Sequence, residues 1–187
     1  SSNTTYFLFV RAVSRTGLAT AYVAGGSTVT LPNVPVAAAD TFSGLTAGGV
    51  AAAWDANSNP AGTRYQALLS TAAPLVLTHA GNVAVATAPQ GAPAAAFTGL
   101  AANTTYHLFV AAQGHAGALS AYASLGSTAT LPSAPASTAS TFSAVASGSL
   151  TGAWGAGGNP AGTRYDATLS TATPLVETHA GNVAVST

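Results

Sequence analysis

The sequence predicts an all-β protein made of tandem β-sandwiches, and three observations lead to that prediction. The chain repeats itself at a period of 100 residues: positions 1–87 align with 101–187 without an insertion, and about 50 of them are identical. Short runs of alternating apolar and polar residues are separated by clusters of Gly, Pro, Asn and Ser. No window has a convincing helical period. Because a sandwich module has about 100 residues, one period corresponds to one module.

Seven short strands are expected within a complete period. The segment "NSNPAG" at 57–62 separates the second strand from the third, because Asn, Pro and Gly favour turns. In the sixth strand Tyr106, Leu108, Val110 and Ala112 alternate along the chain and therefore share one face, as a core-facing strand requires. The expected strands are 41–45, 49–54, 63–70, 74–81, 94–100, 104–113 and 126–131.

Several positions in this pattern resemble those of fibronectin type III modules. Trp54 lies late in the second strand, Tyr65 lies in the third, and Leu100 precedes Tyr106 at the spacing of that family's tyrosine corner. The segment "TLPSAP" at 130–135 resembles a linker that enters the next module. The resemblance implies tandem immunoglobulin-like, fibronectin type III sandwiches from an extracellular repeat protein of bacterial type. The family core positions that it implies are Trp54, Tyr65, Leu100, Tyr106, Trp154, Tyr165 and Tyr6.

The same resemblance divides the chain into three pieces. Residues 34–131 are expected to form one complete module. Residues 1–31 correspond to the last two strands, F and G, of an incomplete preceding module, and residues 134–187 to the N-terminal strands of an incomplete following module. A lone hairpin is marginally stable in water and a partial sandwich exposes strand edges, so neither end piece is expected to fold alone.

Two arrangements would complete these end pieces. One is a single long covalent array of modules. The other is a polymer of separate subunits, in which the N-terminal hairpin of one subunit completes the C-terminal half-module of another by strand complementation. Positions 88–100, which include a whole expected strand, have no counterpart in the second copy. A complemented module would lack that strand, which favours the covalent array.

The composition excludes several classes of function. Only 4% of the residues are charged, the net charge is zero and lysine is absent, so the chain cannot neutralise a run of nucleic-acid phosphates. With no cysteine there is no disulfide, thiolate nucleophile or iron–sulfur cluster. No segment approaches 18 consecutive apolar residues, so no membrane span is expected. A surface with so little charge is poorly protected against self-association, which suits a protein that associates or carries glycans.

The candidate sites have weak signals. The triplet "NTT" places N-glycosylation sequons at Asn3 and Asn103, although Asn is also a common turn residue just before strand F. His79 and His179 recur in "THAGN", but no other ligand stands at zinc spacing from them. The aspartates Asp40, Asp55 and Asp166 are isolated, so no calcium cage is expected. Neither a metal nor a cofactor is therefore expected.

Catalytic and integrin-type motifs are not evident. The loops at 13–20 and 113–120, where some fibronectin type III modules carry RGD, lack the aspartate. Arg64 and Arg164 are shared by both copies and are interpreted as structural, with Arg64 pointing outward beside an inward Tyr65. The sequence has neither a nucleophile with a matching base nor a pair of carboxylates at catalytic spacing, so no enzyme is expected.

The sequence therefore predicts a structural, non-catalytic protein of the extracellular space or cell surface that forms a filament, stalk or surface coat. Its partners would be copies of itself or adjacent modules, with glycans as a further class. The alternative is an adhesin, or a carbohydrate-binding or spacer module of a secreted protein.

Overall fold

The computed structural model describes residues 1–87 and 93–186, and all regular structure in them is β-strand. The chain divides into two compact units, Ser1–Leu131 and Pro132–Thr187, which are described separately below. Among the described residues no helix is long and apolar enough to cross a membrane.

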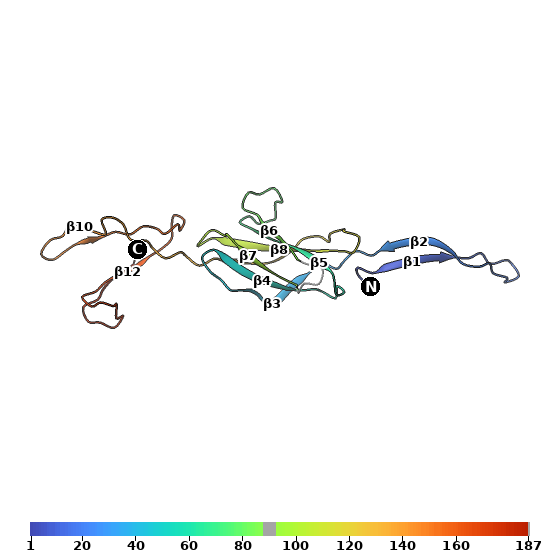
Figure 1. Cartoon of the computed structure of the whole chain (residues 1–187), viewed down its shortest axis with the longest axis horizontal. Coiled ribbons are helices and arrows are strands. Elements are labelled where there is room, and N and C mark those ends of the chain that lie inside the picture. The colour runs from blue at the N-terminus through green and yellow to red at the C-terminus, as the bar shows by residue number, and fades with distance from the viewer. Residues whose placement is uncertain (88–92, 187) are drawn as a thin grey trace. The chain divides into compact units, whose positions relative to one another are not determined.

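The first unit contains a two-layered β-sandwich (Figure 1). A three-stranded sheet has the order β3–β4–β7 and a four-stranded sheet has the order β6–β5–β8–β9, with antiparallel neighbours throughout. The predicted fold class, an all-β fibronectin type III-like sandwich, is confirmed. The strands are β3 (Val36–Ser43), β4 (Gly49–Asp55), β5 (Arg64–Ser70), β6 (Val83–Ala86), β7 (Ala94–Thr98), β8 (Thr105–Gln113) and β9 (Ala123–Ala129).

Side chains from both sheets form one hydrophobic core. Alternate residues of β4, β5 and β8 point into it, because successive side chains of a strand lie on opposite faces. The Trp54 and Tyr65 rings meet edge to face, with their centroids 5.6 Å apart and their planes at 69°. The buried positions are Val50, Ala52, Trp54, Tyr65, Ala67, Leu69, Phe97, Leu100, Tyr106, Leu108, Val110, Ala112 and Leu125.

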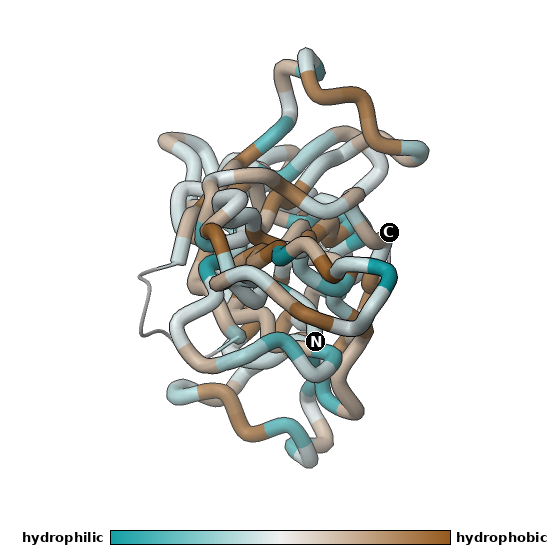
Figure 2. Tube along the Cα trace, turned by 90° about the vertical axis from the view of Figure 1, so that its right-hand side faces the viewer, coloured by the Kyte–Doolittle hydropathy of each residue, from teal (hydrophilic) through white to brown (hydrophobic). Residues whose placement is uncertain are grey.

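The strand predicted at 74–81 is wrong: these residues form a loop, and the strand that pairs with β5 is β6. Pro74 has no N–H to give to a ladder. The Asn82 side-chain amide donates to the carbonyls of Val76 and Leu77, at 2.9 and 3.1 Å, and so replaces strand pairing with a closed turn. Both of these apolar residues are exposed; the loop projects beyond β6 in Figure 1, and its hydrophobic stretch is brown at the top of Figure 2.

Two other strands begin earlier than predicted, and β3, β7 and β9 each end two residues earlier than predicted. Strand β3 begins at Val36 rather than at 41, and its pairing with β4 is interrupted between Ala37 and Phe42. Strand β9 begins at Ala123 rather than at 126. Polar or small residues at these ends concealed the alternation that marks a strand.

An N-terminal hairpin precedes the sandwich. Its strands are β1 (Thr5–Val10) and β2 (Val23–Val29), and they pair with the irregularity that β8 and β9 also have. Within the described residues no second sheet covers the hairpin: Leu8 is 58% and Val10 is 55% exposed, whereas their counterparts Leu108 and Val110 are 0% exposed.

The second unit has two short antiparallel pairs. Strand β10 (Phe142–Ser143) pairs with β11 (Thr151–Gly152), and β12 (Asp166–Leu169) pairs with β13 (Val183–Ser186). The Trp154 and Tyr165 rings repeat the edge-to-face contact of the first unit, at 6.0 Å and 62°. Phe142, Leu150 and Leu169 are exposed, so this unit has the beginning of a sandwich without a closed core.

Candidate functional site at the module junction

An asparagine side chain holds the linker that connects the hairpin to the sandwich. Asn59 Oδ1 accepts a hydrogen bond from the Asn33 amide at 2.7 Å, and Asn59 Nδ2 donates to the Asn33 carbonyl at 2.8 Å. One side chain thus pairs with both backbone groups of a linker residue, as a neighbouring strand would. The second unit repeats this clamp, with Asn159 bonded to the amide and carbonyl of Ser133 at 2.7 and 2.8 Å.

The linker before the sandwich has additional bonds. Asn57 Nδ2 donates to the Val34 carbonyl, and Asn33 Nδ2 donates to the Asn57 carbonyl, both at 2.8 Å. The Asn57 amide donates to the Asp55 carboxylate at 2.6 Å, which fixes the turn after β4. Asn57 has a φ of 52°, a left-handed conformation that asparagine tolerates better than most residues.

Asn3 joins the hairpin to the sandwich. Its side chain is almost completely buried, with 1% of the residue exposed. Nδ2 donates to Thr63 Oγ1 at 2.9 Å, and Oδ1 accepts a hydrogen bond from the His115 backbone amide at 2.6 Å. Thr63 Oγ1 in turn donates to the Pro60 carbonyl at 2.8 Å. The hairpin is therefore bonded both to the turn before β5 and to the loop after β8.

A glycine allows this close approach. A Cβ atom added to Gly114 would lie 3.2 Å from Asn3 Oδ1 and 3.2 Å from Pro32 Cδ. Either neighbour would have to shift to admit it. A residue without a side chain therefore lets the loop after β8 pack against both the hairpin and the linker.

This junction and a glycan on Asn3 exclude one another. A glycan would replace a hydrogen of Nδ2, the atom that donates to Thr63, and would need an exit from a buried site. Asn103 has a nearly identical φ, 45° against 46° for Asn3, and is exposed. N-glycosylation of Asn103 stays a prediction.

The other predicted positions lie as follows. Trp54, Tyr65, Leu100 and Tyr106 are buried in the sandwich, and the Tyr106 hydroxyl accepts a hydrogen bond from the Ala101 amide at 3.1 Å. Burial raises the pKa of the Tyr65 hydroxyl, a hydrogen bond from Asn59 opposes this, and the Asp55 charge adds to it. In the second unit Trp154 and Tyr165 are half-buried, and Tyr6 in the hairpin is exposed.

The repeated histidines close a loop. His79 Nε2 lies 2.7 Å from Thr71 Oγ1, and His179 Nε2 lies 2.9 Å from Thr171 Oγ1. In the part of the chain that the structure describes, no group of three His, Asp or Glu side chains could hold a metal ion.

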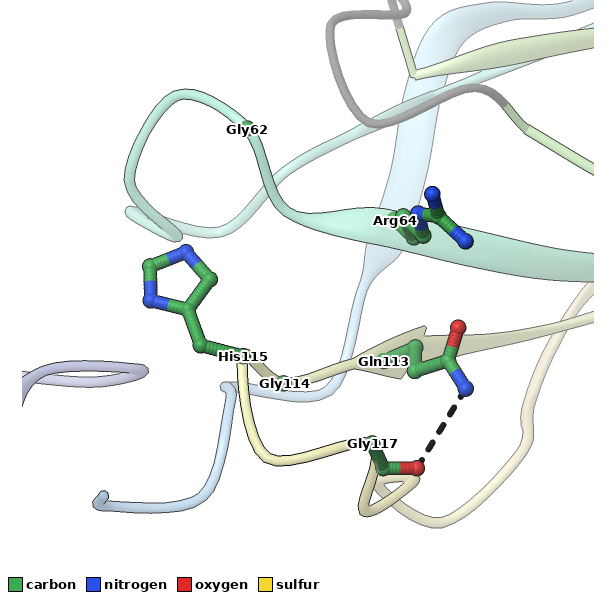
Figure 3. Close-up of a pocket in the computed structure, with 6 residues that line it drawn as sticks. All are labelled: Gly62, Arg64, Gln113, Gly114, His115 and Gly117. Carbon is green, nitrogen blue, oxygen red and sulfur yellow. Dashed lines mark hydrogen bonds between the residues drawn. The ribbon is translucent and has the colours of Figure 1, made fainter. Parts of the chain in front are cut away.

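A shallow hollow of about 350 Å³ lies beside the junction (Figure 3). Arg64, Gln113 and His115 contribute its polar side chains, and Gln113 Nε2 donates to the Gly117 carbonyl at 3.3 Å. The Arg64 and His115 side chains point apart, so they do not converge on one ligand atom.

The sequence reasoning missed Asn59, Thr63 and Gly114. A signal was present for the first two, because both belong to "NPAGTRY" at 59–65, which recurs unchanged at 159–165. Asparagine in this block is expected as a turn former from its residue type alone, and its bonds to the linker are visible only in the structure. Gly114 is not shared by the other copy, where the equivalent residue is Ser14. The repeat therefore gives no sign that a glycine is needed at this position.

No protein family model and no curated protein sequence matches the chain. Solved structures do match. One, described as "Myokine structure", is 17% identical, with a TM-score of 0.40, and the match covers 54% of this chain and 98% of that one. Another, the crystal structure of chicken CNTN1 FN1–FN3 domains, is 17% identical, with a TM-score of 0.42, and the match covers 68% of this chain and 41% of that one. These likenesses concern the fold alone.

Proposed function

We propose that the chain is a structural, non-catalytic part of an extracellular repeat protein, in which fibronectin type III-like modules are held end to end in a filament, stalk or surface coat. The array is either one long covalent chain or a series of subunits joined by strand complementation. Its partners are adjacent modules or copies of itself.

The observation that supports this proposal is the junction. Asn3 bonds the last strands of one repeat to two separate loops of the next, and the Asn59 clamp fixes the linker between them. The clamp recurs at Asn159, which favours an array of modules whose linkers are held in the same way. Inter-module flexibility is the default where such contacts are few.

Electron micrographs of the native protein, together with its intact mass, test this proposal. We expect extended particles of uniform width with a substructure that repeats once per module. A mass far above 18.0 kDa would favour the covalent array, and a mass near that value in assembled fibres would favour strand complementation. Compact native particles that do not associate would contradict the structural role.

The alternative role, a carbohydrate-contacting or adhesive module, has one observation in its favour. The hollow beside Arg64, Gln113 and His115 offers hydrogen-bond donors at the surface. Its described lining includes no Trp, Tyr or Phe, whereas sugar sites commonly use such a ring as a stacking platform. Specific hits in a glycan-array screen, lost on Arg64→Ala, would favour this role over the structural one.

A further inference from the structure

Residues 132–186 contain a hydrophobic groove where the central module has its core. The groove is a cavity of about 530 Å³. Its lining includes Phe142, Leu150, Trp154, Leu169, Val183 and Val185. Each of these positions is the counterpart of a residue in or against the core of the first sandwich, namely Phe42, Val50, Trp54, Leu69, Val83 and Val85. The groove is therefore that core with some of its strands removed.

The strands that fill this position in the first sandwich are β8 and β9. Strand β8 pairs with β5, with Ala67 opposite Val110 and Leu69 opposite Leu108. Strand β12, the counterpart of β5, pairs with β13 on one side, and no described strand of residues 132–186 lies along its other side. Within residues 132–186, the apolar groove therefore lies beside a backbone edge of β12 with which no described strand pairs.

A hairpin of matching sequence and shape exists elsewhere in the chain. Strand β1 keeps Tyr6, Leu8 and Val10 at the positions that Tyr106, Leu108 and Val110 occupy in β8. Its pairing with β2 has the same irregularity as the β8–β9 pair, and both hairpins place glycine, Gly26 or Gly126, at a φ of 111°. The β8–β9 hairpin is already packed in the sandwich, whereas the apolar residues of β1 are exposed.

We propose that the groove of residues 132–186 binds the β1–β2 hairpin of a second copy of this chain. This inference rests on the proposed structural function and names its partner and its contact. The expected register puts Leu8 of the second copy opposite Leu169 and Val10 opposite Ala167, as in β8 and β5. Main-chain bonds along β12 provide affinity, and the alternate side chains in the groove provide register.

Such a contact is heterologous, because the hairpin and the groove are different surfaces of the chain. Each further copy can add by the same contact, and a heterologous contact whose rotation does not close into a ring propagates as a fibre. Strand β11 has no partner corresponding to β7 in the described residues, so the completed module lacks the contact that Phe97 makes in the first sandwich. Strands supplied by the same polypeptide, where present, compete for the same groove.

Disulfide trapping tests the register directly, because the chain has no cysteine of its own. In the first sandwich Leu68 lies opposite Phe109, so the exchange places position 168 opposite position 9 of the second copy. The variants Phe9→Cys and Thr168→Cys are mixed and oxidised. We expect one heterodimer of twice 18.0 kDa, with a disulfide between positions 9 and 168 identified by peptide mass.

The matched control moves one cysteine by one residue. Val10→Cys replaces Phe9→Cys, which turns the thiol to the other face of the strand, and the yield with Thr168→Cys should fall at least about tenfold. Equal yields from the two pairs, or no disulfide between positions 9 and 168, would overturn the proposed exchange.

Association in solution gives the second measurement. Leu8→Asp puts a carboxylate into the contact and should weaken association, followed by light scattering, by at least about a hundredfold. Leu18→Asp is the matched control, because it adds the same charge to the hairpin loop at a position whose counterpart, Ala118, is exposed. Equal association of both variants contradicts the exchange.

The exchange and the proposed function can fail separately. Native filaments without a disulfide between positions 9 and 168 would contradict the exchange and leave the proposed function standing. A disulfide between these positions without native filaments would support the exchange and contradict the proposed function.

Discussion

Asn3 connects three stretches of chain that are far apart in the sequence: the hairpin, the turn at 60–63 and the loop after β8. Asn3 Nδ2 donates one hydrogen bond, Asn3 Oδ1 accepts another, and the residue is nearly completely buried. A buried amide that loses either partner retains an unsatisfied polar group, so the site is sensitive to single substitutions.

Asn3→Gly should release the hairpin from the sandwich. Glycine accepts the positive φ of this position, so the substitution removes the side chain without straining the backbone. The His115 amide loses its acceptor, and we expect its hydrogen exchange to rise by about fivefold, as the loss of about 1 kcal/mol predicts. Ser2→Ala is the control, since Ser2 Oγ makes only an exposed bond of 3.3 Å to the Ser58 carbonyl. An unchanged rate at His115 in the glycine variant would count against the junction.

Tyr65 makes the stability of the sandwich fall at alkaline pH. Burial raises the pKa of its hydroxyl above the value of about 10 that it has in the unfolded chain. The folded state therefore holds the proton more tightly, and this contribution is complete below about pH 10 and is lost as the pH rises through the folded-state pKa. Denaturant titrations should show a free energy of unfolding that declines above about pH 10, and less steeply in Tyr65→Phe. The same slope in both proteins would refute this account.

At the scale of elements, the loop 71–82 is built by its own side chains. Thr71 and His79 close its base, Asn82 ties its carbonyls, and the His79 amide donates to the Val76 carbonyl at 3.0 Å. The same bonds recur in residues 171–182, so the loop is a second constant feature of the repeat. A side chain on Gly81 would overlap Thr71 Oγ1 and the His79 ring.

Gly81→Ala should therefore open this loop. We expect it to lower the free energy of unfolding by about 1–3 kcal/mol, as overpacking does, and to expose the loop to limited proteolysis. Gly48→Ala is a suitable control, because its new Cβ would meet only the Leu100 carbonyl at 3.9 Å, an ordinary contact. A Gly81 variant as stable and protease-resistant as the control would show that the loop tolerates the change.

The elements that alternate regularly could be predicted from the sequence, and those held by side-chain bonds could not. Strands β4, β5 and β8 have apolar residues at every second position, and their predicted bounds are within a residue of those observed. The loop 71–82 contains apolar residues too, but the Asn82 bonds hold its backbone away from the ladder. At the junction, the local sequence predicts a turn former at Asn59 and a turn former or glycan acceptor at Asn3. It does not predict their hydrogen bonds, because the partners lie 26 and 60 residues away.

At the scale of the whole molecule, the hydrogen bonds that join the hairpin and linker to the sandwich connect almost entirely neutral groups. The Asn3, Thr63, Asn59 and Asn33 contacts are all of this kind, and the Asp55 carboxylate is the exception. Salt screens interactions between charges and has little effect on neutral hydrogen bonds.

The stability of the first unit should therefore be nearly independent of ionic strength. Between about 0.05 and 1 M NaCl, where the screening length falls several-fold, we expect the free energy of unfolding to change by less than about 0.5 kcal/mol. Hydrogen exchange at the His115 amide should stay constant over the same range. A large loss of protection at high salt would reveal a charged contribution to the junction.

The neutrality of the Asn3 and Asn59 contacts has an ecological consequence if these joints set the spacing of a surface layer. Joints built from salt bridges loosen when the surroundings turn saline or acidic, so a coat of that kind changes its pitch with its habitat. A coat with amide joints would keep one pitch from rainwater to brine.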